Sequence, residues 1–160
     1  MRPLPLLILS GILFLSTTTL AQMKSLNAND TLAAANLSPK EFREIIADLK
    51  KSAFDIPQSW TTELRLRRIN LGKRSGIVIQ GTSLLCGGTG NCQTWVFRQA
   101  NGTWTSMFAA DQVPIAEGFD FGPTATRGIA DLTISTNLSA DGSKRVKYKF
   151  DGKRYRPKFE

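Results

Sequence analysis

Cationic side chains near the C-terminal end of the sequence are regularly spaced and form the first candidate site, one for binding anions. Lysine and arginine alternate with apolar residues in KRVKYKF and return in KRYRPK, on either side of Asp151-Gly152. Alternation places every second side chain on one face of a strand. The side chains predicted to share a solvent-facing side are Arg145, Lys147, Lys149, Arg154 and Arg156. Such a cluster would bind anionic groups.

The interpretation of this cluster depends on which residues of the hairpin lie opposite each other. If Asp151-Gly152 is a two-residue turn, Lys147 lies opposite Arg156 and Lys149 lies opposite Arg154, while Tyr148 and Tyr155 pair on the inward face. Like charges directly opposite each other destabilise a sheet, and a bound anion would offset that repulsion. The alternative is that the cations only keep a sheet edge from pairing with another chain. Both interpretations remain open at this point.

A second candidate group is acidic, and it could support hydrolysis of a glycosidic bond if two carboxyl groups faced one cleft. Its members are Asp111, Glu117, Asp120 and Asp131. Acids in connections rich in glycine and proline more often form turns. The chain has no histidine, which removes histidine-assisted nucleophiles and most metal hydrolases. The sequence therefore favours a binding protein over an enzyme, with no catalytic residue, cofactor or metal expected.

Cys86 and Cys92 are the two cysteines of the chain, and three glycines lie between them in CGGTGNC. An exported protein in an oxidising compartment would pair them. We expect this disulfide mainly to hold the shape of a turn between two strands. A secondary possibility is that the loop presents backbone N–H groups to a ligand. Two thiols without histidine are too few ligands for a zinc site.

The N-terminus is typical of a secretory signal peptide. Arg2 is followed by the apolar run LPLLILSGILFL, and small residues precede a cleavage site predicted after Ala21. No later segment is long and apolar enough for a transmembrane span. The formal net charge is +8. For a periplasmic or secreted protein this charge favours an anionic glycan, a lipid headgroup or an acidic protein of the envelope as partner, rather than nucleic acid.

Three parts are expected: the signal peptide of residues 1–21, a flexible lead-in of residues 22–36, and a single domain of residues 37–160. The domain begins with an amphipathic helix in LSPKEFREIIADLKKSA, for which Ser38, Pro39 and Glu41 supply N-cap, first-turn proline and capping box. The remaining segments indicate strands. The predicted fold is therefore α+β, with one N-terminal amphipathic helix packed on an antiparallel β-sheet built of hairpins.

Several details of the sheet follow from local patterns. TTELRLRRINL changes its apolar phase at Arg67-Arg68, which predicts a bulge. Asn101-Gly102 predicts a two-residue hairpin turn that puts four aromatic side chains on one face. These are Trp95, Phe97, Trp104 and Phe108. We expect them to be core, although a sugar-stacking platform is the alternative. Residues 113–128 are expected to be a long connection with little strand character.

Three segments, CGGTGNCQTWVFR, GIADLTIST and YKFDGKRYR, together resemble small exported bacterial proteins of unassigned function. Those proteins share a Cys-Gly-Gly-x-Gly-x-Cys loop and a C-terminal Tyr-x-Phe-Asp-Gly hairpin. The resemblance covers about residues 77–156; it implies a bacterial exported domain and no particular activity. The last two segments are also similar to one blade of integrin-type propeller repeats, without the aspartates of the calcium loop. In size, disulfide use and sheet content the chain is similar to small periplasmic lysozyme inhibitors.

The function that these observations predict is that of an exported, non-catalytic domain that engages an anionic envelope partner through a basic sheet surface. One alternative is a carboxylate-dependent glycan hydrolase. Another is an inhibitor of a cell-wall enzyme.

Overall fold

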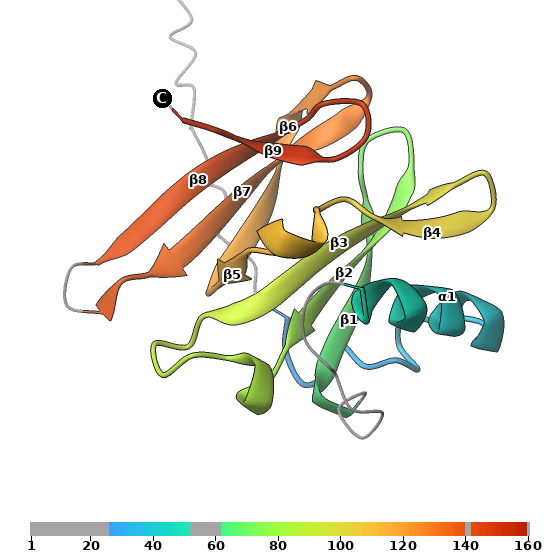
Figure 1. Ribbon diagram of the computed structural model, residues 1–160, viewed down its shortest axis with the longest axis horizontal. Coiled ribbons are helices and arrows are strands. Elements are labelled where there is room, and N and C mark those ends of the chain that lie inside the picture. Colours follow the sequence, from blue (N-terminus) through green and yellow to red (C-terminus); the bar gives the residue numbers. More distant parts are fainter. Residues whose placement is uncertain (1–25, 52–61, 140–141, 160) are drawn as a thin grey trace, which may run out of the picture.

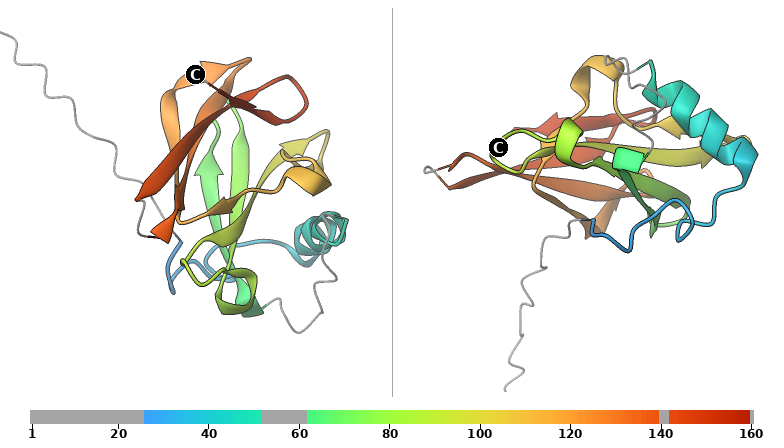
Figure 2. Two further views of the ribbon diagram at one scale, coloured as in Figure 1. Left: turned by 60° about the vertical axis from the view of Figure 1, so that its left-hand side comes forward. Right: turned by 90° about the horizontal axis from the view of Figure 1, so that it is seen from below.

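The computed structural model describes residues 26–51, 62–139 and 142–159, so the predicted signal peptide of residues 1–21 lies outside the described residues. The described chain forms three layers: a helix, a first sheet and a second sheet (Figures 1 and 2). The helix is α1 (Pro39–Leu49). Within the described ranges, no helix is long and apolar enough to cross a membrane.

Both sheets are antiparallel throughout their described pairings. The first has the order β1 (Leu64–Asn70), β2 (Ser75–Gly81), β3 (Cys92–Ala100) and β4 (Thr103–Ser106), with the short β5 (Ile115–Ala116) also paired to β3. The second has the order β6 (Gly118–Thr126), β7 (Ile129–Asn137), β8 (Ser143–Phe150) and β9 (Tyr155–Lys158). The α+β class is confirmed, but the prediction of one sheet is wrong.

The first sheet is apolar on both faces because a different layer covers each. The face toward α1 packs Leu66, Ile79 and Trp95 with helix residues Ile45 and Leu49 into one core cluster. The opposite face contributes Val78 and Val96 to a second cluster, which the second sheet completes. One helix on one sheet, as predicted, would leave the face away from the helix uncovered, but in the structure the second sheet covers it.

The start of α1 follows the predicted capping box. The Ser38 hydroxyl accepts a hydrogen bond from the Glu41 N–H at 3.2 Å, and the Glu41 carboxylate accepts one from the Ser38 N–H at 2.9 Å. These two bonds satisfy backbone donors that a helix start otherwise leaves unpaired. Pro39 is in the first turn, as expected. The predicted helix extended to Ala53, but residues 52–61 lie outside the described residues.

Acids on α1 also cover the free edge of the first sheet. The Glu44 carboxylate accepts from the Trp104 N–H at 3.4 Å, and the Asp48 carboxylate accepts from the Ser106 N–H at 2.9 Å. Both donors belong to β4, the strand at that edge. A helix that satisfies edge N–H groups removes a template for association with other chains. The helix therefore packs through its apolar stripe and is aligned with β4 by its carboxylates.

The helix is not at the N-terminus of the folded part, because residues 26–36 pack against the first sheet before it begins. Composition placed these residues in a flexible lead-in. Asp30 receives two hydrogen bonds from the Arg67 guanidinium, at 2.7 and 2.6 Å, and Ala35 is buried. The Asp30 carbonyl accepts from the Leu66 N–H of the edge strand β1 at 2.9 Å. These residues thus cover the edge of the first sheet opposite β4.

The bulge predicted at Arg67-Arg68 is absent, since β1 pairs with β2 in unbroken register from Leu64 to Asn70. Leu64 and Leu66 face the helix layer, whereas Ile69 packs on the opposite side, against the second core cluster. The apolar phase changes because different layers cover the two ends of the strand, and the backbone stays regular. A change in the alternation of apolar residues along a strand therefore indicates a bulge only when the sheet buries one of its faces and exposes the other.

The Asn101-Gly102 turn is confirmed, with positive φ angles of 53° and 76° and the predicted pairing of Phe97 with Ser106. Two positive φ angles are the type I′ geometry that suits the twist of a hairpin. Trp95 and Trp104 are buried in the helix-side cluster, as expected for core residues. Phe108 departs from the prediction: it follows β4, which ends at Ser106, and belongs to the cluster between the sheets.

The expected connection of residues 113–128 is wrong, because most of it is the nine-residue strand β6. Gly122, Pro123 and Thr124 fall in a register shift between Phe121 and Ala125, where the ladder with β7 is interrupted. Strand interiors disfavour proline, but an edge strand with an irregularity accommodates it. The turn to β7 is Arg127-Gly128, whose φ angles of 54° and 78° match the first hairpin. Arginine is uncommon at such a turn, so the sequence around Arg127-Gly128 does not predict the β6–β7 hairpin.

Replacing Trp95 with alanine tests the helix-side core. Trp95 is 1 % exposed, so Trp95→Ala should lower the free energy of unfolding by about 3–5 kcal/mol through lost transfer energy and a residual cavity. Urea unfolding followed by circular dichroism measures this. Gln99→Ala, at an exposed position of the same strand, should change stability by less than about 0.5 kcal/mol. Unchanged stability of the Trp95 variant would contradict the core assignment.

The capping box gives a pH dependence with a defined sign. Hydrogen bonds from the Ser38 backbone and side chain lower the pKa of Glu41 to about 2. A carboxyl whose pKa is lower in the folded state stabilises the fold above its unfolded pKa, and this contribution is lost as pH falls toward the folded pKa. The stability difference between wild type and Glu41→Gln should therefore be constant above about pH 5 and shrink toward pH 2. Urea unfolding across this range measures it; a pH-independent difference would refute the assignment.

Candidate functional site

Strand β8 presents cations on the outer face of the second sheet. Arg145, Lys147 and Lys149 are exposed, while the alternate residue Phe150 is buried between the sheets. This alternation agrees with the sequence prediction. The second sheet is an outer layer of the molecule, so no other described element covers this face (Figure 2).

The register of the final hairpin differs from the prediction by two residues. Phe150 pairs with Tyr155, so the loop contains four residues, 151–154, in place of two. The pairs that follow are Lys149 with Arg156 and Lys147 with Lys158. A shift of two residues keeps the side chains that remain in the two strands on their predicted faces. Like charges still face each other across the strands, but the partners have changed.

The Asp151 side chain explains the longer loop. Its carboxylate accepts hydrogen bonds from the N–H groups of Lys153 and Arg154, both at 2.7 Å, and from the Arg156 Nε at 3.0 Å. These bonds lower the pKa of Asp151 to about 2, with the backbone donors as the main cause. The loop conformation therefore depends on a side chain that satisfies two backbone donors. Arg154 belongs to this loop and is half-buried, so it does not share a strand face with the other four predicted cations.

We use the name basic face for the outward cations of β8 and β9: Arg145, Lys147, Lys149, Arg156 and Lys158. Lys158 stands where the register puts it, opposite Lys147, although the predicted pairing placed no cation there. Lys149 is 4.0 Å from the Asp131 carboxylate, and Arg156 is bound to Asp151. Within the described part of the chain, Arg145, Lys147 and Lys158 have no ion pair.

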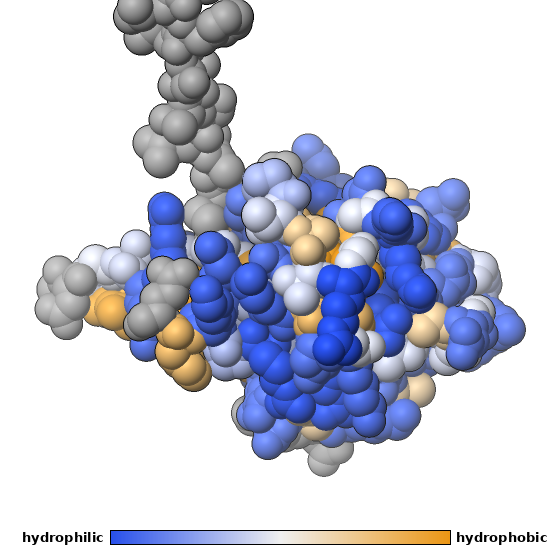
Figure 3. Space-filling view, turned by 90° about the horizontal axis from the view of Figure 1, so that it is seen from above, coloured by the Kyte–Doolittle hydropathy of each residue, from blue (hydrophilic) through white to orange (hydrophobic). Residues whose placement is uncertain are grey.

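The surroundings of the basic face are shallow and polar. A groove of about 390 Å³ runs over Arg145, Lys147 and Lys158 beside Thr133 and the exposed Phe159. Across the ladder from β8, Ser135 pairs with Arg145 and Thr133 with Lys147. Figure 3, a view from above, shows hydrophilic side chains over most of the surface, with apolar atoms in small patches. Ser135 is buried, so such a surface offers a ligand the charges and the half-buried Thr133.

Arg156 turns away from the other cations of the basic face. Its Nη1 donates to the Gln112 side chain at 2.9 Å, across the edge of β9. Arg156 and Gln112 lie at a groove of about 520 Å³ between the second sheet and residues 112–115, with Tyr148, Ile115 and Pro157 among its other lining residues. Arg156 thus connects the basic face to the open side of the sandwich.

The predicted acidic group is dispersed. Asp120 lines a groove beside Arg67 and Arg68, and Glu117 lines a different groove beside Arg65. Asp131 is buried and accepts hydrogen bonds from the hydroxyls of Thr124 and Thr126, at 2.9 and 2.7 Å. Asp111 lies exposed in the short 3-10 helix of residues 110–112. Each acid therefore has its own environment in the described structure, and no two line the same one of these grooves.

No metal site emerges from these acids either. Within the described ranges, no three aspartate, glutamate, cysteine or histidine side chains lie close enough together to hold a metal ion.

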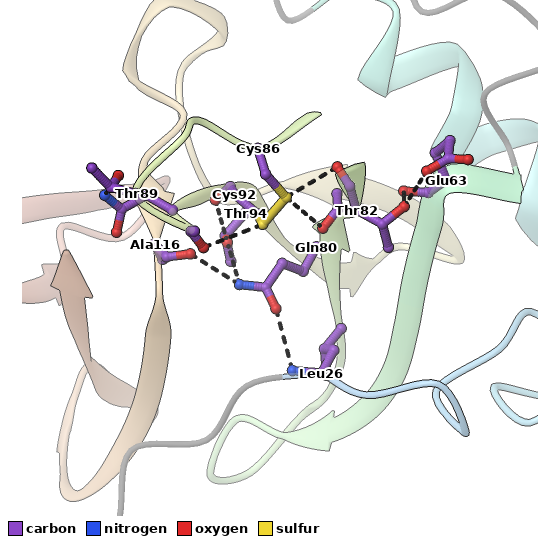
Figure 4. The surroundings of a disulfide bond; sticks show 12 residues. Leu26, Glu63, Gln80, Thr82, Cys86, Thr89, Cys92, Thr94 and Ala116 are labelled. Atoms are coloured by element: carbon purple, nitrogen blue, oxygen red, sulfur yellow. Dashed lines mark hydrogen bonds between the residues drawn. A yellow bond between two sulfur atoms is a disulfide. The ribbon is translucent and has the colours of Figure 1, made fainter. Parts of the chain in front are cut away.

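The predicted disulfide between Cys86 and Cys92 is confirmed, and Figure 4 shows its surroundings. The two residues lie directly opposite each other in an isolated antiparallel bridge. Within the loop, the Gly87 N–H donates to the Asn91 carbonyl and the Gly90 N–H donates to the Gly87 carbonyl. Two of the N–H groups that could have met a ligand are therefore used to close the turn. A disulfide fits an oxidising compartment.

The disulfide loop also connects the two sheets. The buried Asn91 side chain donates to the Asn137 carbonyl and accepts from the Asn137 N–H, both at 2.7 Å, at the end of β7. Nearby, the buried Gln80 side chain donates to the Ala116 carbonyl at 3.2 Å and accepts from the Leu26 N–H at 3.2 Å (Figure 4). These amides satisfy buried backbone groups where the layers meet. The loop is thus a structural clamp at one end of the sandwich.

Removing the disulfide should weaken the domain without changing its fold. The ring that it closes is small, so the double variant Cys86→Ser/Cys92→Ser should lose about 2 kcal/mol of stability on chain-entropy grounds. Urea unfolding measures the loss, and the amide spectrum should remain that of the folded protein because Asn91 still joins the loop to β7. Intact mass before and after reduction should differ by two hydrogens. Free-thiol labelling of both cysteines in freshly exported protein would contradict the bond.

Comparison of the chain with models of protein families, with curated proteins and with solved structures finds no match. In the described structure, the basic face is the feature best suited to bind a ligand.

Proposed function

We propose that this chain is an exported, non-catalytic domain that binds an anionic partner of the cell envelope through the basic face. The partner chemistry is that of an anionic glycan, a lipid headgroup or an acidic protein. Support for export comes from the signal-type N-terminus and from the disulfide, which fits an oxidising compartment.

The position of β8 inside its sheet is the observation that carries the proposal. Cations on an edge strand are a common protection against association of sheets, and β9 is such an edge. Strand β8, however, pairs with β7 on one side and β9 on the other. Edge protection accounts for Arg156 and Lys158, and also for Arg145, which lies beyond the β8–β9 ladder, but it leaves Lys147 and Lys149 unexplained. A surface for binding anions accounts for both strands.

Repulsion between cations in the free protein also supports a role in binding anions. Lys147 faces Lys158 and Lys149 faces Arg156, and directly opposed like charges destabilise a sheet. Among the described residues, the carboxylates within ion-pair distance of the basic face are Asp131 and Asp151, and both also accept hydrogen bonds from groups other than these cations. A bound anion would relieve the repulsion that remains.

The two alternative functions have less support in the described geometry. A glycan hydrolase needs two carboxyl groups facing one cleft, and the four candidate acids lie in separate environments. An inhibitor of a cell-wall enzyme would use the same basic face against an acidic enzyme, so it remains a special case of the proposal.

The double variant Lys147→Gln/Lys158→Gln tests the proposed function. It removes two opposed cations that lack described ion pairs, so stability should stay equal or rise slightly. Affinity for isolated cell envelopes, measured by co-sedimentation, should fall by about tenfold or more, since each basic residue near an anionic surface contributes about 1 kcal/mol. The loss should diminish as salt is raised, because salt screens exposed charges.

A matched control is Arg43→Gln/Lys50→Gln, which removes the same charge from exposed positions on and next to α1, in the layer farthest from the basic face. It should bind envelopes like wild type. Equal weakening by both double variants would mean that net charge alone drives binding. Full binding by the Lys147/Lys158 variant would leave the cations with the role of preventing aggregation.

A further inference from the structure

Three loops meet at the end of the sandwich to which β8 leads (Figures 1 and 2). The turn between β1 and β2 reaches the second sheet: the Ala130 N–H donates to the Leu71 carbonyl at 3.1 Å, and the Lys73 N–H donates to the Gly128 carbonyl at 3.3 Å. Gly72 has a φ of +87°, and a Cβ there would lie 2.9 Å from the Gly128 carbonyl oxygen. This close backbone approach fixes the β1–β2 turn beside the β6–β7 turn.

The β6–β7 turn also contacts the loop between β8 and β9. The guanidinium of Arg127 lies against Gly152, where an added Cβ would come within 2.5 Å of its Nη1. Gly152 also has a φ of +111°, a conformation that residues with side chains rarely adopt. Backbone geometry and the absence of a side chain at Gly152 therefore bring Arg127 next to the loop that ends β8.

These loops carry cations that we call the loop cluster: Lys73, Arg74, Arg127, Lys153 and Arg154. Among the described residues, none of the five has an ion pair. The acid inside the same loops is Asp151, whose carboxylate already accepts from two backbone N–H groups and from Arg156. The loop cluster is thus a second group of unneutralised positive charge, built from three separate parts of the chain.

The basic face leads directly into the loop cluster. Every second residue of a strand is displaced by about 7 Å along it, so Arg145, Lys147 and Lys149 form a regular row. Strand β8 then ends at Phe150 and continues into the loop that carries Lys153 and Arg154. The row and the loop cluster follow one another along the outer face and over the end of the sandwich, with Asp131 beside Lys149 and Asp151 bound to Arg156 where they meet. We call this arrangement the cationic track.

We infer that the anionic partner is a linear polyanion that lies along β8 and continues onto the loop cluster. This inference rests on the proposed function and adds the shape and chemistry of the ligand: an extended chain carrying phosphate or sulfate groups. A row with regular spacing matches repeated charges better than it matches one compact anion. The outward residues of β7 next to the row are Ser135, Thr133 and Asp131. The exposed Phe159 also lines the groove over Arg145, Lys147 and Lys158. A ligand would therefore meet the row mainly through charge and hydrogen bonds.

The inference is tested by comparing the binding of long and short anions to the protein without the predicted signal peptide, residues 22–160. Long-chain polyphosphate and dextran sulfate should bind, with pyrophosphate and glucose 6-sulfate as their short counterparts at equal concentrations of charged groups. Binding measured by fluorescence anisotropy of labelled polymer should resist competition by the short anions, and the logarithm of affinity should fall linearly with the logarithm of salt concentration. The two polymers distinguish phosphate from sulfate as the preferred group.

Variants at both ends of the track locate the polymer. Lys73→Gln/Arg74→Gln removes two exposed cations of the loop cluster, and Lys147→Gln/Lys158→Gln removes two from the basic face. Each should weaken polymer binding by about tenfold or more and reduce the salt slope by about one per charge removed. The effects should add, because the positions are far apart. Arg43→Gln/Lys50→Gln should bind polymer like wild type.

The possible results separate this inference from the proposed function. If only the Lys147/Lys158 variant weakens binding, or if the short anions compete as well as the polymers, the basic face binds anions but the track does not exist. Binding to vesicles of anionic lipid without binding to either polymer would also overturn the inference and would identify a headgroup as the ligand. Absence of binding to every anionic probe and to envelopes would overturn both.

Discussion

Burial of the first sheet on both faces is the constraint on which the rest of the structure depends. Its strands supply apolar side chains to two clusters, one with α1 and one with the second sheet. A sheet of this kind needs two covering layers, each of which buries one side only. The second sheet therefore has an inner face that completes the core and an outer face that is free to be polar. The basic face exists because β8 and β9 belong to this outer layer.

Charges have different uses in the two halves of the molecule. Around the first sheet they hold the layers together: Arg67 is bound to Asp30, Arg68 contacts Glu41 at 3.5 Å, and helix carboxylates accept from the edge N–H groups of β4. The Arg67 guanidinium lowers the pKa of Asp30, as expected of a paired carboxylate. In the described part of the second sheet, Lys144, Arg145, Lys147 and Lys158 have no ion pair, so their charge is available to a ligand.

Two aspartates of the second sheet and its loops hold the conformation of the nearby backbone. Asp151 organises the four-residue loop that ends β8, and Asp131 joins the hydroxyls of Thr124 and Thr126 beside the irregular part of β6. Tyr155 adds a further link, since its buried hydroxyl donates to the Ala130 carbonyl at 2.7 Å. Burial is the main cause that raises its pKa, so it stays a neutral donor. These contacts set the positions of the cations around them.

Features that depend only on neighbouring residues can be predicted from the amino-acid sequence. Ser38, Pro39 and Glu41 begin the helix, Asn101-Gly102 forms the predicted turn, and Cys86 pairs with Cys92. The alternation of β8 gave the correct face for Arg145, Lys147 and Lys149, because side-chain period is a property of the strand alone. These choices are local, and the tertiary structure agrees with them.

Which helices and strands pack against one another depends on the tertiary structure. A local pattern does not say how many layers cover a sheet, so it predicts neither the second sheet nor the regular backbone of β1 at its change of apolar phase. Nor did it give the register of the last hairpin, which depends on how the Asp151 carboxylate satisfies the loop N–H groups. The meeting of Gly72 with Gly128 and of Arg127 with Gly152 joins residues far apart in the chain. Contacts between distant segments follow from packing of the whole core, and no short stretch of sequence contains that information.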